Sequence, residues 1–308
     1  MSRKWQGVLV ALWTVLGFAF MASALESQAA ASEARPKAPC PPTPGVLPAN
    51  DILRGACLFR STVAFGQDPQ GPFANCATCH YGLDTTDRGT HLIQITNGQG
   101  QTIQLLRRTP SLLNSPVNFP YGWDGRFGTI QDAARAAILS PVEMGGTTVT
   151  DDQLDSLAAF VLSMGQSPPE PEPAPITDQG TLLLIALGKT IFFGKGTCGA
   201  TCHPAPTFTN NSVTTNQVNA DFSGQTDPGA GFVGTGGFRE FKVPSLLHLG
   251  TLQPFMHNGA LARVPQVVRF YNESLGLNLT VREMTGLEYW LRNCLRGGVQ
   301  NTNRPPTC

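Results

Sequence analysis

Hydrophobic residues recur at the spacing of an α-helix in six segments of this 308-residue chain. Apolar positions three or four residues apart give each helix one face to bury. Thr150-Asp151-Asp152-Gln153 precedes the third run and is typical of a helix N-terminus. The alternation typical of strands is weak, so we expect a mostly α protein with long ordered loops and little strand. The predicted helices lie near residues 50–60, 130–139, 150–164, 178–193, 264–272 and 280–295.

The N-terminus has the layout of a secretory signal peptide. Arg3 and Lys4 precede a mostly apolar run from Val8 to Ala24, which ends in the small-residue pattern Ala22-Ser23-Ala24. An uncleaved membrane anchor is the alternative, because the run is almost long enough to span a bilayer. We expect residues 1–24 to be removed, which leaves a soluble periplasmic protein with no membrane segment and an environment that permits disulfides.

Two proline-rich stretches divide the rest of the chain. Residues 25–48 form a leader that contains RPKAPCPPTPGVLP, and residues 167–175 contain a stiff linker, PPEPEPAP. We therefore expect two domains, residues 49–166 (the N-terminal half) and residues 176–308 (the C-terminal half).

The two halves are related by an internal duplication. RTPSLL begins at Arg108 and is followed by Trp123-Asp124-Gly125; KVPSLL begins at Lys242 and is followed by His257-Asn258-Gly259. Each pair is 134 residues apart, and both segments then enter a helical pattern. Two copies imply paired domains and exclude a long repeat array.

Composition narrows the function classes. The chain has 21 basic and 21 acidic residues, and removal of residues 1–24 leaves 19 against 21, so no field of one sign indicates binding to nucleic acid or to anionic lipid. A hydrophobic content of 41% excludes a disordered chain, and the 33 glycines and 25 prolines have no collagen-like period. Long ordered loops in a chain with few charged residues imply that a component other than secondary structure, such as a bound group, organises these loops.

Cys76-Ala77-Thr78-Cys79-His80 is the C-x-x-C-H signature of covalent c-type haem attachment. On one helical turn the thiols of Cys76 and Cys79 can reach the two vinyl groups of a porphyrin, and the imidazole of His80 can bind the iron. A redox C-x-x-C pair and half of a zinc site are the alternatives. The adjacent histidine, the absence of a second C-x-x-C and the predicted export favour haem.

The duplicated partner of this motif is Cys198-Gly199-Ala200-Thr201-Cys202-His203, with three residues between the cysteines. The extra residue must bulge, and Gly199 tolerates a bulge because it carries no side chain. We expect a second covalent haem on Cys198, Cys202 and His203; a single thioether bond is the alternative. Two haems would replace much of the apolar core that helices otherwise supply.

Four further cysteines suggest two disulfides in an exported protein. Three pairings are open, and proximity in the sequence favours Cys40 with Cys57 and Cys294 with Cys308.

The sides of the two irons opposite His80 and His203 decide the chemistry. Tyr271 lies 27 residues after Pro244, and the same step from Pro110 reaches Ala137. If both positions face a haem, a phenol caps the second iron and the first stays open to a small molecule. An ordinary half-buried tyrosine is the alternative, and Met256 and His257 are alternative caps; His257 could instead bind a propionate.

An open iron needs a group that handles protons. Glu143 lies six residues past Ala137, where a carboxylate could move a proton between the oxygens of bound peroxide. Trp123 stands between the haem motifs and could relay an electron between the irons. A solvated glutamate and a packed aromatic are the plain alternatives.

At these residues the sequence resembles the bacterial dihaem cytochrome c peroxidase and MauG superfamily. The motifs are CATCH, RRTPSLLN, WDGRFG, SPVEMG, FKVPSLL and PFMHNGALARVPQVVRFYN, and they span the mature chain. The resemblance implies a fold of two cytochrome-c-like domains, with Trp123 as the inter-haem tryptophan, Glu143 as the distal acid/base and His257 as the second-haem histidine. It also implies that Tyr271 is the sixth ligand of the second iron. MauG-type members have tyrosine at this position, whereas classical peroxidases have methionine.

Members of the MauG type use peroxide to reach a bis-ferryl state that oxidises tryptophan or tyrosine side chains of a separate protein. A related enzyme of methanobactin operons modifies a tryptophan of a copper-binding partner, and this sequence resembles that branch as well. The resemblance therefore implies an enzyme whose partners are hydrogen peroxide and a periplasmic protein.

Several residues depart from the family pattern. Arg108 replaces an asparagine that helps bind calcium between the haems, so calcium fits poorly even though backbone ligands could remain at Leu252 and Pro254. Ala133 and Ala137 replace a distal glutamine and a distal proline. Gly196 replaces a relay tryptophan, so any exit route must differ. The spacing of His91 does not fit a distal histidine, and we expect it on a surface loop.

Three functions remain open. The first is peroxide-driven oxidation of a partner protein. The second is removal of peroxide with electrons from a small redox protein, which the phenolate ligand disfavours because it stabilises ferric iron. The third, from another class, is a dihaem electron carrier with both irons capped.

Overall fold

The computed structural model describes residues 49–82, 85–165, 176–215, 226–250, 252–295 and 308. The predicted signal peptide, the leader and the linker lie outside these residues. In chain order the N-terminal half contains α2 (Asp51–Arg60), η1 (Cys76–Thr78), β1 (Thr90–Thr96), β2 (Thr102–Arg108), α3 (Ile130–Leu139) and α4 (Asp151–Gly165). The C-terminal half contains α5 (Gln179–Phe193), α6 (Cys198–Thr201), β3 (Val213–Thr215), α7 (Ala230–Val233), β4 (Glu240–Lys242), α8 (Val264–Ser274) and α9 (Val281–Cys294).

The fold is mostly helical, as predicted, and the six predicted helices are present with boundaries shifted by at most two residues. Their first turns are fixed by capping side chains, because the first amides of a helix have no partner within it. Thr129 accepts a hydrogen bond from the amide of Asp132, and Thr280 forms a capping box with Glu283. Thr150 and Gln153 exchange hydrogen bonds of 2.9 and 3.2 Å ahead of α4, which confirms the N-terminus predicted there.

Strand is confined to two small antiparallel sheets among the described residues. β1 and β2 form a hairpin in which Thr96, the last residue of β1, pairs with Thr102, the first residue of β2. β3 pairs with β4. The hairpin was not predicted. Ile95, close to the turn, is buried, whereas Leu92 and Leu106 are partly exposed, so the hydrophobic alternation is incomplete.

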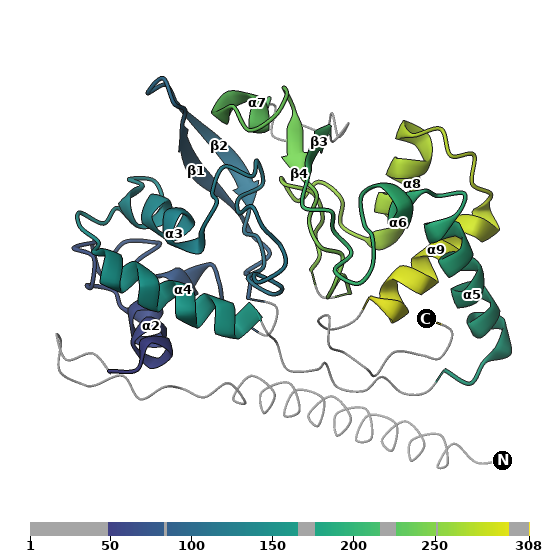
Figure 1. The fold of residues 1–308 in the computed structure, drawn as a ribbon, viewed down its shortest axis with the longest axis horizontal. Helices are drawn as coiled ribbons and strands as arrows, with labels where there is room; N and C mark the ends of the chain where they lie inside the picture. The colour runs from purple at the N-terminus through teal and green to yellow at the C-terminus, as the bar shows by residue number, and fades with distance from the viewer. Residues whose placement is uncertain (1–48, 83–84, 166–175, 216–225, 251, 296–307) are drawn as a thin grey trace, which may run out of the picture. The chain divides into compact units, whose positions relative to one another are not determined.

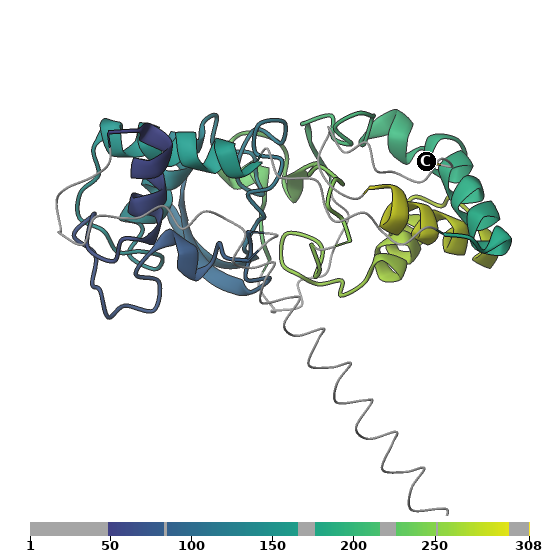
Figure 2. The ribbon, with the colours of Figure 1, turned by 90° about the horizontal axis from the view of Figure 1, so that it is seen from below.

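Each half has its own apolar core, and Figure 1 shows the helices that enclose each core as a separate group. In the N-terminal half α2, α3 and α4 surround Phe65 and Ile138, both fully buried. In the C-terminal half α5, α8 and α9 pack together, as Figure 2 also shows, around Phe192 and Trp290. Among the described residues, none of the helices combines the length and apolar character needed to cross a bilayer.

The predicted duplication is visible in the backbone. Helix α3 begins at Ile130 and α8 at Val264, which are 134 residues apart. Positive φ angles recur at the same offset, at Asn114 and His248, at Gly122 and Met256, and at Gly125 and Gly259. Bridges recur likewise, between Tyr121 and Phe127 and between Phe255 and Leu261. Residues at this offset can therefore be compared as structural equivalents.

Both helix crossings depend on a glycine. A Cβ at Gly55 of α2 would lie 1.9 Å from the carbonyl oxygen of Ser156 in α4. A Cβ at Gly188 of α5 would lie 2.0 Å from the carbonyl oxygen of Gly286 in α9. Only glycine lets the two backbones approach this closely.

We expect Gly188→Ala to destabilise the folded protein by about 1–3 kcal/mol or more, because the added methyl group must push α5 away from α9. The midpoint of urea unfolding, followed by circular dichroism, measures the change. Gly98→Ala is the matched control, since a Cβ there meets nothing within 4 Å. An unchanged midpoint for Gly188→Ala would contradict this account of the crossing.

Candidate functional site

The first cysteine motif forms a single turn that presents three groups to one cavity. Cys76 begins η1, and the amide of His80 donates to the carbonyl of Cys76 at 2.9 Å, which closes the turn. Nδ1 of His80 lies 3.1 Å from the carbonyl oxygen of Thr85. This contact fixes the ring and leaves Nε2 for a metal, the usual arrangement of a histidine ligand.

The environment of the two thiols favours their neutral form. Burial raises the pKa of Cys76 to about 12, and burial together with Asp87 and Glu143 raises the pKa of Cys79 to about 12. A redox cysteine pair needs a thiol with a lowered pKa. These thiols therefore suit neutral thioethers better than redox chemistry.

The second motif absorbs its extra residue in a wider turn. The amide of His203 donates to the carbonyl of Cys198 at 2.8 Å, one residue further back than the bond from His80. A Cβ at Gly199 would lie 2.5 Å from the ring of Phe193, so glycine is required here by close packing. Gly199 does not have a positive φ, so the missing side chain on which the sequence argument rested matters here through close packing.

The two motifs share their supporting contacts. Nδ1 of His203 lies 2.8 Å from the carbonyl of Phe208, five residues on, as Nδ1 of His80 lies against Thr85. Both Thr85 and Phe208 have a positive φ. Burial lowers the pKa of His203 to about 4, so its imidazole is neutral, the form that binds a metal. The residues therefore fit a metal-bound porphyrin in each half.

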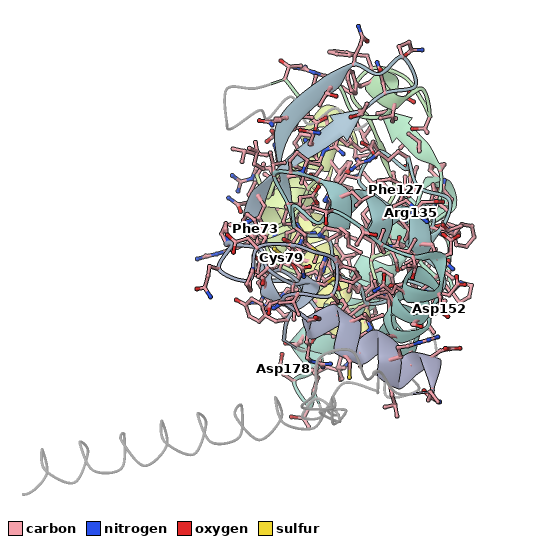
Figure 3. All side chains as sticks on the ribbon, turned by 90° about the vertical axis from the view of Figure 1, so that its left-hand side faces the viewer. Phe73, Cys79, Phe127, Arg135, Asp152 and Asp178 are labelled. Carbon is pink, nitrogen blue, oxygen red and sulfur yellow. A yellow bond between two sulfur atoms is a disulfide. The ribbon has the colours of Figure 1, made fainter. Side chains whose placement is uncertain are left out.

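One cavity of about 330 Å³ brings the predicted residues of the first site together. Cys76, Cys79 and His80 line it, and so do Trp123 and Glu143. Phe73, labelled with Cys79 in Figure 3, lines it as well. Helix α3 contributes Ala133, Ala134 and Ala137. The small side chains at positions 133 and 137 leave room where the family has glutamine and proline.

Glu143 is held in this cavity by the loop that follows α3. Its amide donates to the carbonyl of Ser140 at 3.2 Å, and the amide of Met144 folds back onto the carbonyl of Ala137. Burial raises the pKa of the Glu143 carboxyl to about 7, and the nearby Ser140 and Arg126 partly oppose this shift. A carboxyl with this pKa can both accept and return a proton near neutral pH.

Tyr271 is the structural equivalent of Ala137, and lies on α8 as Ala137 lies on α3. It is half-buried, and burial together with the neighbouring Cys202 and Cys198 raises its pKa to about 12. Since Ala137 lines the first cavity, the equivalence directs position 271 to the second haem motif. Gly196, in the relay position, donates its amide to the carbonyl of Ile191 within the turn after α5.

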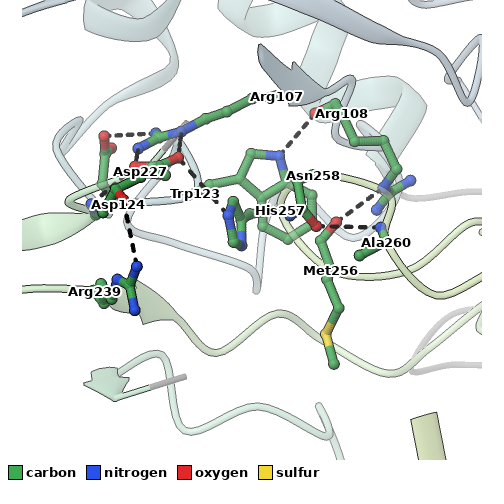
Figure 4. A network of polar contacts seen from close by, with 12 residues as sticks. Arg107, Arg108, Trp123, Asp124, Asp227, Arg239, Met256, His257, Asn258 and Ala260 are labelled. Atoms are coloured by element: carbon green, nitrogen blue, oxygen red, sulfur yellow. Dashed lines mark hydrogen bonds and ion pairs between the residues drawn. The ribbon is translucent and has the colours of Figure 1, made fainter. Parts of the chain in front are cut away.

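Trp123 is fixed at the contact between the halves (Figure 4). Its indole Nε1 donates to the carbonyl of Arg108 at 2.8 Å, and the Arg108 guanidinium lies 5.1 Å from the centre of the ring. The Trp123 carbonyl accepts from the amide of Lys242 at 2.8 Å. Arg108 thus fixes the ring, and Lys242 of the C-terminal half holds the backbone of the same residue.

His257, the structural equivalent of Trp123, is 5% exposed and stacks on Phe241 with ring centres 3.9 Å apart. Its carbonyl accepts from the amide of Arg108 at 2.8 Å, and its Nε2 lies 3.9 Å from Asp227.

Two residues at this contact were missed from the sequence. Arg107, which is 2% exposed, donates to Asp124 at 2.7 Å and to Asp227 at 2.7 and 2.8 Å. Lys242 is also buried and lines the first cavity, although it belongs to the C-terminal half. The residues next to Arg107 in the sequence did not indicate its ion pairs with Asp124 and Asp227. The duplication did offer one signal for Lys242, since it stands in the position of Arg108.

We expected His91 on a surface loop, and this prediction was wrong. His91 lies in β1, its side chain is half-buried, and it lines the first cavity with Nε2 against Asp87. Donor atoms of Cys79, Asp87 and His91 lie within 4.8 Å of one another. They could hold a metal ion only if Cys79 remained a free thiol, which the haem motif opposes.

The Arg108 guanidinium lies where the resemblance places calcium. Its Nε donates to the carbonyl of Met256 and its Nη1 to the carbonyl of Leu252, each at 3.4 Å. Leu252 is one of the two backbone ligands expected for calcium. A cation already contacts these oxygens, so a calcium ion does not fit.

The cysteines outside the haem motifs are disulfide-bonded where the structure describes them. Cys294 is joined to Cys308, with Cα atoms 5.4 Å apart, which is the pairing that sequence proximity favours. Cys57 is also bonded, and Cys40 lies outside the described residues.

Comparison with known proteins gives a consistent result. The family model of di-haem cytochrome c peroxidase matches residues 70–163. The methylamine utilization protein MauG of Methylorubrum extorquens is 29% identical over 230 residues, which are 64% of this chain and 62% of that protein. The chain thus spans 62% of the length of this curated relative.

Two solved structures share the fold. A MauG-like protein associated with microbial copper homeostasis has a TM-score of 0.62 at 17% identity, covering 87% of this chain and 95% of that one. The diheme peroxidase BthA of Burkholderia thailandensis has a TM-score of 0.58 at 16% identity, covering 84% and 88%. The sequence matches and the shared fold together show that the chain is similar to MauG and the dihaem cytochrome c peroxidases.

Proposed function

We propose that this chain is an exported, MauG-like enzyme that uses hydrogen peroxide to oxidise tryptophan or tyrosine side chains of a separate periplasmic protein. The cavity that His80, Glu143 and Trp123 share carries the proposal. It brings together an iron ligand, a proton-handling carboxyl and an aromatic ring, which are the three groups that the reaction needs.

Two haems would be held covalently, one by Cys76, Cys79 and His80 and the other by Cys198, Cys202 and His203. When bound they supply the redox chemistry, in which one peroxide accepts two electrons and two protons and leaves as two waters. The thiols with raised pKa and the neutral imidazole of His203 support these assignments.

Glu143 is the acid/base in this proposal. In its ionised form it takes the proton of one peroxide oxygen and returns it to the other, so that the O–O bond breaks with water as the leaving group. A pKa of about 7 lets the same carboxyl perform both steps near neutral pH. The alanines of α3 leave room for a ligand as small as peroxide beside it.

Trp123 and Tyr271 have the two remaining roles in this proposal, electron transfer and ligation of the second iron. The indole of Trp123 couples the two sites, since its ring nitrogen is bonded to Arg108 and its backbone carbonyl to Lys242 of the C-terminal half. Tyr271 binds the second iron, and its equivalent Ala137 leaves the first iron open. This asymmetry separates the enzyme from a carrier with two capped irons.

Mass spectrometry tests the reaction with a substrate. The haem-loaded protein is treated with stoichiometric peroxide in the presence of co-expressed exported candidate proteins, and oxidised tryptophan or tyrosine is sought in them. Turnover of peroxide only with a small electron donor would instead support detoxification. Failure of peroxide to change the spectrum would support a simple electron carrier.

We expect Glu143→Gln to slow the first spectral change after peroxide addition by about 100-fold or more, because an amide cannot shuttle the proton. In the wild type this rate should rise with pH through about 7, as the carboxyl ionises and becomes able to accept a proton. Stopped-flow absorbance measures both effects.

The control for this measurement is Glu273→Gln, a change to an exposed carboxylate at the end of α8, which should leave the rate and its pH profile intact. A wild-type rate in Glu143→Gln would remove Glu143 from the mechanism.

We expect Tyr271→Phe to change the spectrum of the second haem and to abolish oxidation of the partner protein, because phenylalanine offers no oxygen to the iron. Electron paramagnetic resonance of the ferric protein reports the ligand. Tyr289→Phe, at a partly exposed position of α9, should change neither property. An unaltered low-spin signal in Tyr271→Phe would mean that another group caps the iron.

We also expect the wild type to need no calcium. Chelation with EGTA should leave its absorption spectrum and its unfolding midpoint unchanged, because the Arg108 guanidinium already contacts the carbonyls of Leu252 and Met256. Arg108→Asn restores the family residue and should make both properties respond to calcium. A wild-type midpoint that falls on chelation would contradict the assignment.

A further inference from the structure

Lys242 is a buried cation that nothing in the proposed reaction uses. It ends β4 in the C-terminal half, is 6% exposed, and lines the cavity of the N-terminal half. Its Nζ donates to the side-chain oxygen of Asn118. Among the described residues no carboxylate forms an ion pair with it. Burial without a counter-charge lowers the pKa of Lys242 to about 7, and an anion beside it would favour the charged ammonium.

The buried acids close to this contact are already paired with arginines. Asp124, which is fully buried, contacts Arg107 and Arg126 at 2.7 Å, and Asp227 contacts Arg107 at 2.7 Å. Both carboxylates are thus already paired with guanidiniums. Glu143, the acidic residue that lines the same cavity, forms no ion pair with Lys242, so a ligand could supply the counter-charge of this ammonium.

The duplication explains why a residue of one half reaches the cavity of the other. Lys242 is the structural equivalent of Arg108, and their backbone amides donate reciprocally, Lys242 to the carbonyl of Trp123 and Arg108 to that of His257, each at 2.8 Å. Their side chains also cross over, Lys242 to Asn118 and Arg108 to Leu252, which are themselves equivalent positions. The crossing is therefore built into the backbone.

We propose that Lys242 is an anion anchor for the first site, and that its ligand is a carboxylate of the bound cofactor, a haem propionate. This inference rests on the haem position of the proposed function. Nζ would donate a charge-assisted hydrogen bond to the propionate, while Asn118 orients the ammonium. The C-terminal half would thereby help to fix the cofactor of the N-terminal half.

Removal of this charge should lower the midpoint potential of the first haem. Reduction adds an electron, and a nearby cation stabilises the added negative charge. For Lys242→Gln we expect the reduction equilibrium of the first haem to become at least tenfold less favourable, about 59 mV for one electron. Lys242→Arg keeps the charge and should retain the wild-type potential. Lys189→Gln, at an exposed site on α5, is the control.

Spectroelectrochemical titration of the covalently loaded protein measures both haems separately, and a crystal structure of the loaded protein locates Nζ. The proposal holds if Nζ contacts a propionate oxygen and the first haem shows the larger shift. It falls if Nζ contacts no propionate, if Lys242→Gln leaves both potentials unchanged, or if the shift is confined to the second haem, whose ligand His203 also feels the Lys242 charge.

These measurements do not depend on peroxide chemistry. Loaded protein that shows the contact and the shift but does not react with peroxide would refute the proposed function and leave the anchor in place. Normal peroxide chemistry in the wild type with an unchanged potential in Lys242→Gln would refute the anchor alone.

Discussion

The contact between the two halves depends on the guanidinium of Arg107. Its donors hold Asp124 of the N-terminal half and Asp227 of the C-terminal half, and none of the three side chains is more than 10% exposed. Loss of one partner from a buried ion pair typically costs about 3–5 kcal/mol, because it leaves an uncompensated charge. Trp123 immediately precedes Asp124, so this ion-pair network also determines where the indole lies. In the proposed function, the position of the electron relay is thus set by an electrostatic constraint outside both haem motifs.

Much of the fold could be predicted from local pattern. The helices show their 3.6-residue period and their capping residues, and the cysteine motifs contain the spacing that covalent attachment requires. The duplication was readable because RTPSLL and KVPSLL keep the same distance to the following glycine, at Gly125 and Gly259. Such signals are carried by residues close together in the chain, and this is why single-sequence reasoning recovers them.

The remaining features of the fold and the site depend on contacts between residues far apart in the sequence, which only the structure shows. Arg107 and Asp227 are 120 residues apart, and the sequence of neither indicates that they meet. The hairpin of β1 and β2 presents mixed polar and apolar residues on both faces, so its alternation was too weak to predict. His91 was placed on a surface loop because its spacing does not fit a distal histidine, whereas the hairpin carries it to the cavity wall. The pKa of Glu143 likewise depends on burial by segments that local sequence does not identify.

The duplication gives a physical reason for the asymmetry on which the proposed function rests. Equivalent backbones hold different side chains at three positions that face the sites: Ala137 and Tyr271, Trp123 and His257, Arg108 and Lys242. Because the backbone hydrogen bonds at the last pair remain reciprocal, the exchange of side chains changes the chemistry without changing the framework. In the proposed function, a methyl group in place of a phenol opens one site, and an indole in place of an imidazole gives one half the electron relay. An ammonium in place of a guanidinium gives the first cavity a compact point charge in place of a planar fork that binds carbonyls. Two copies of one scaffold can thereby perform different steps of a single oxidation, and the scaffold supplies the fixed distance between them.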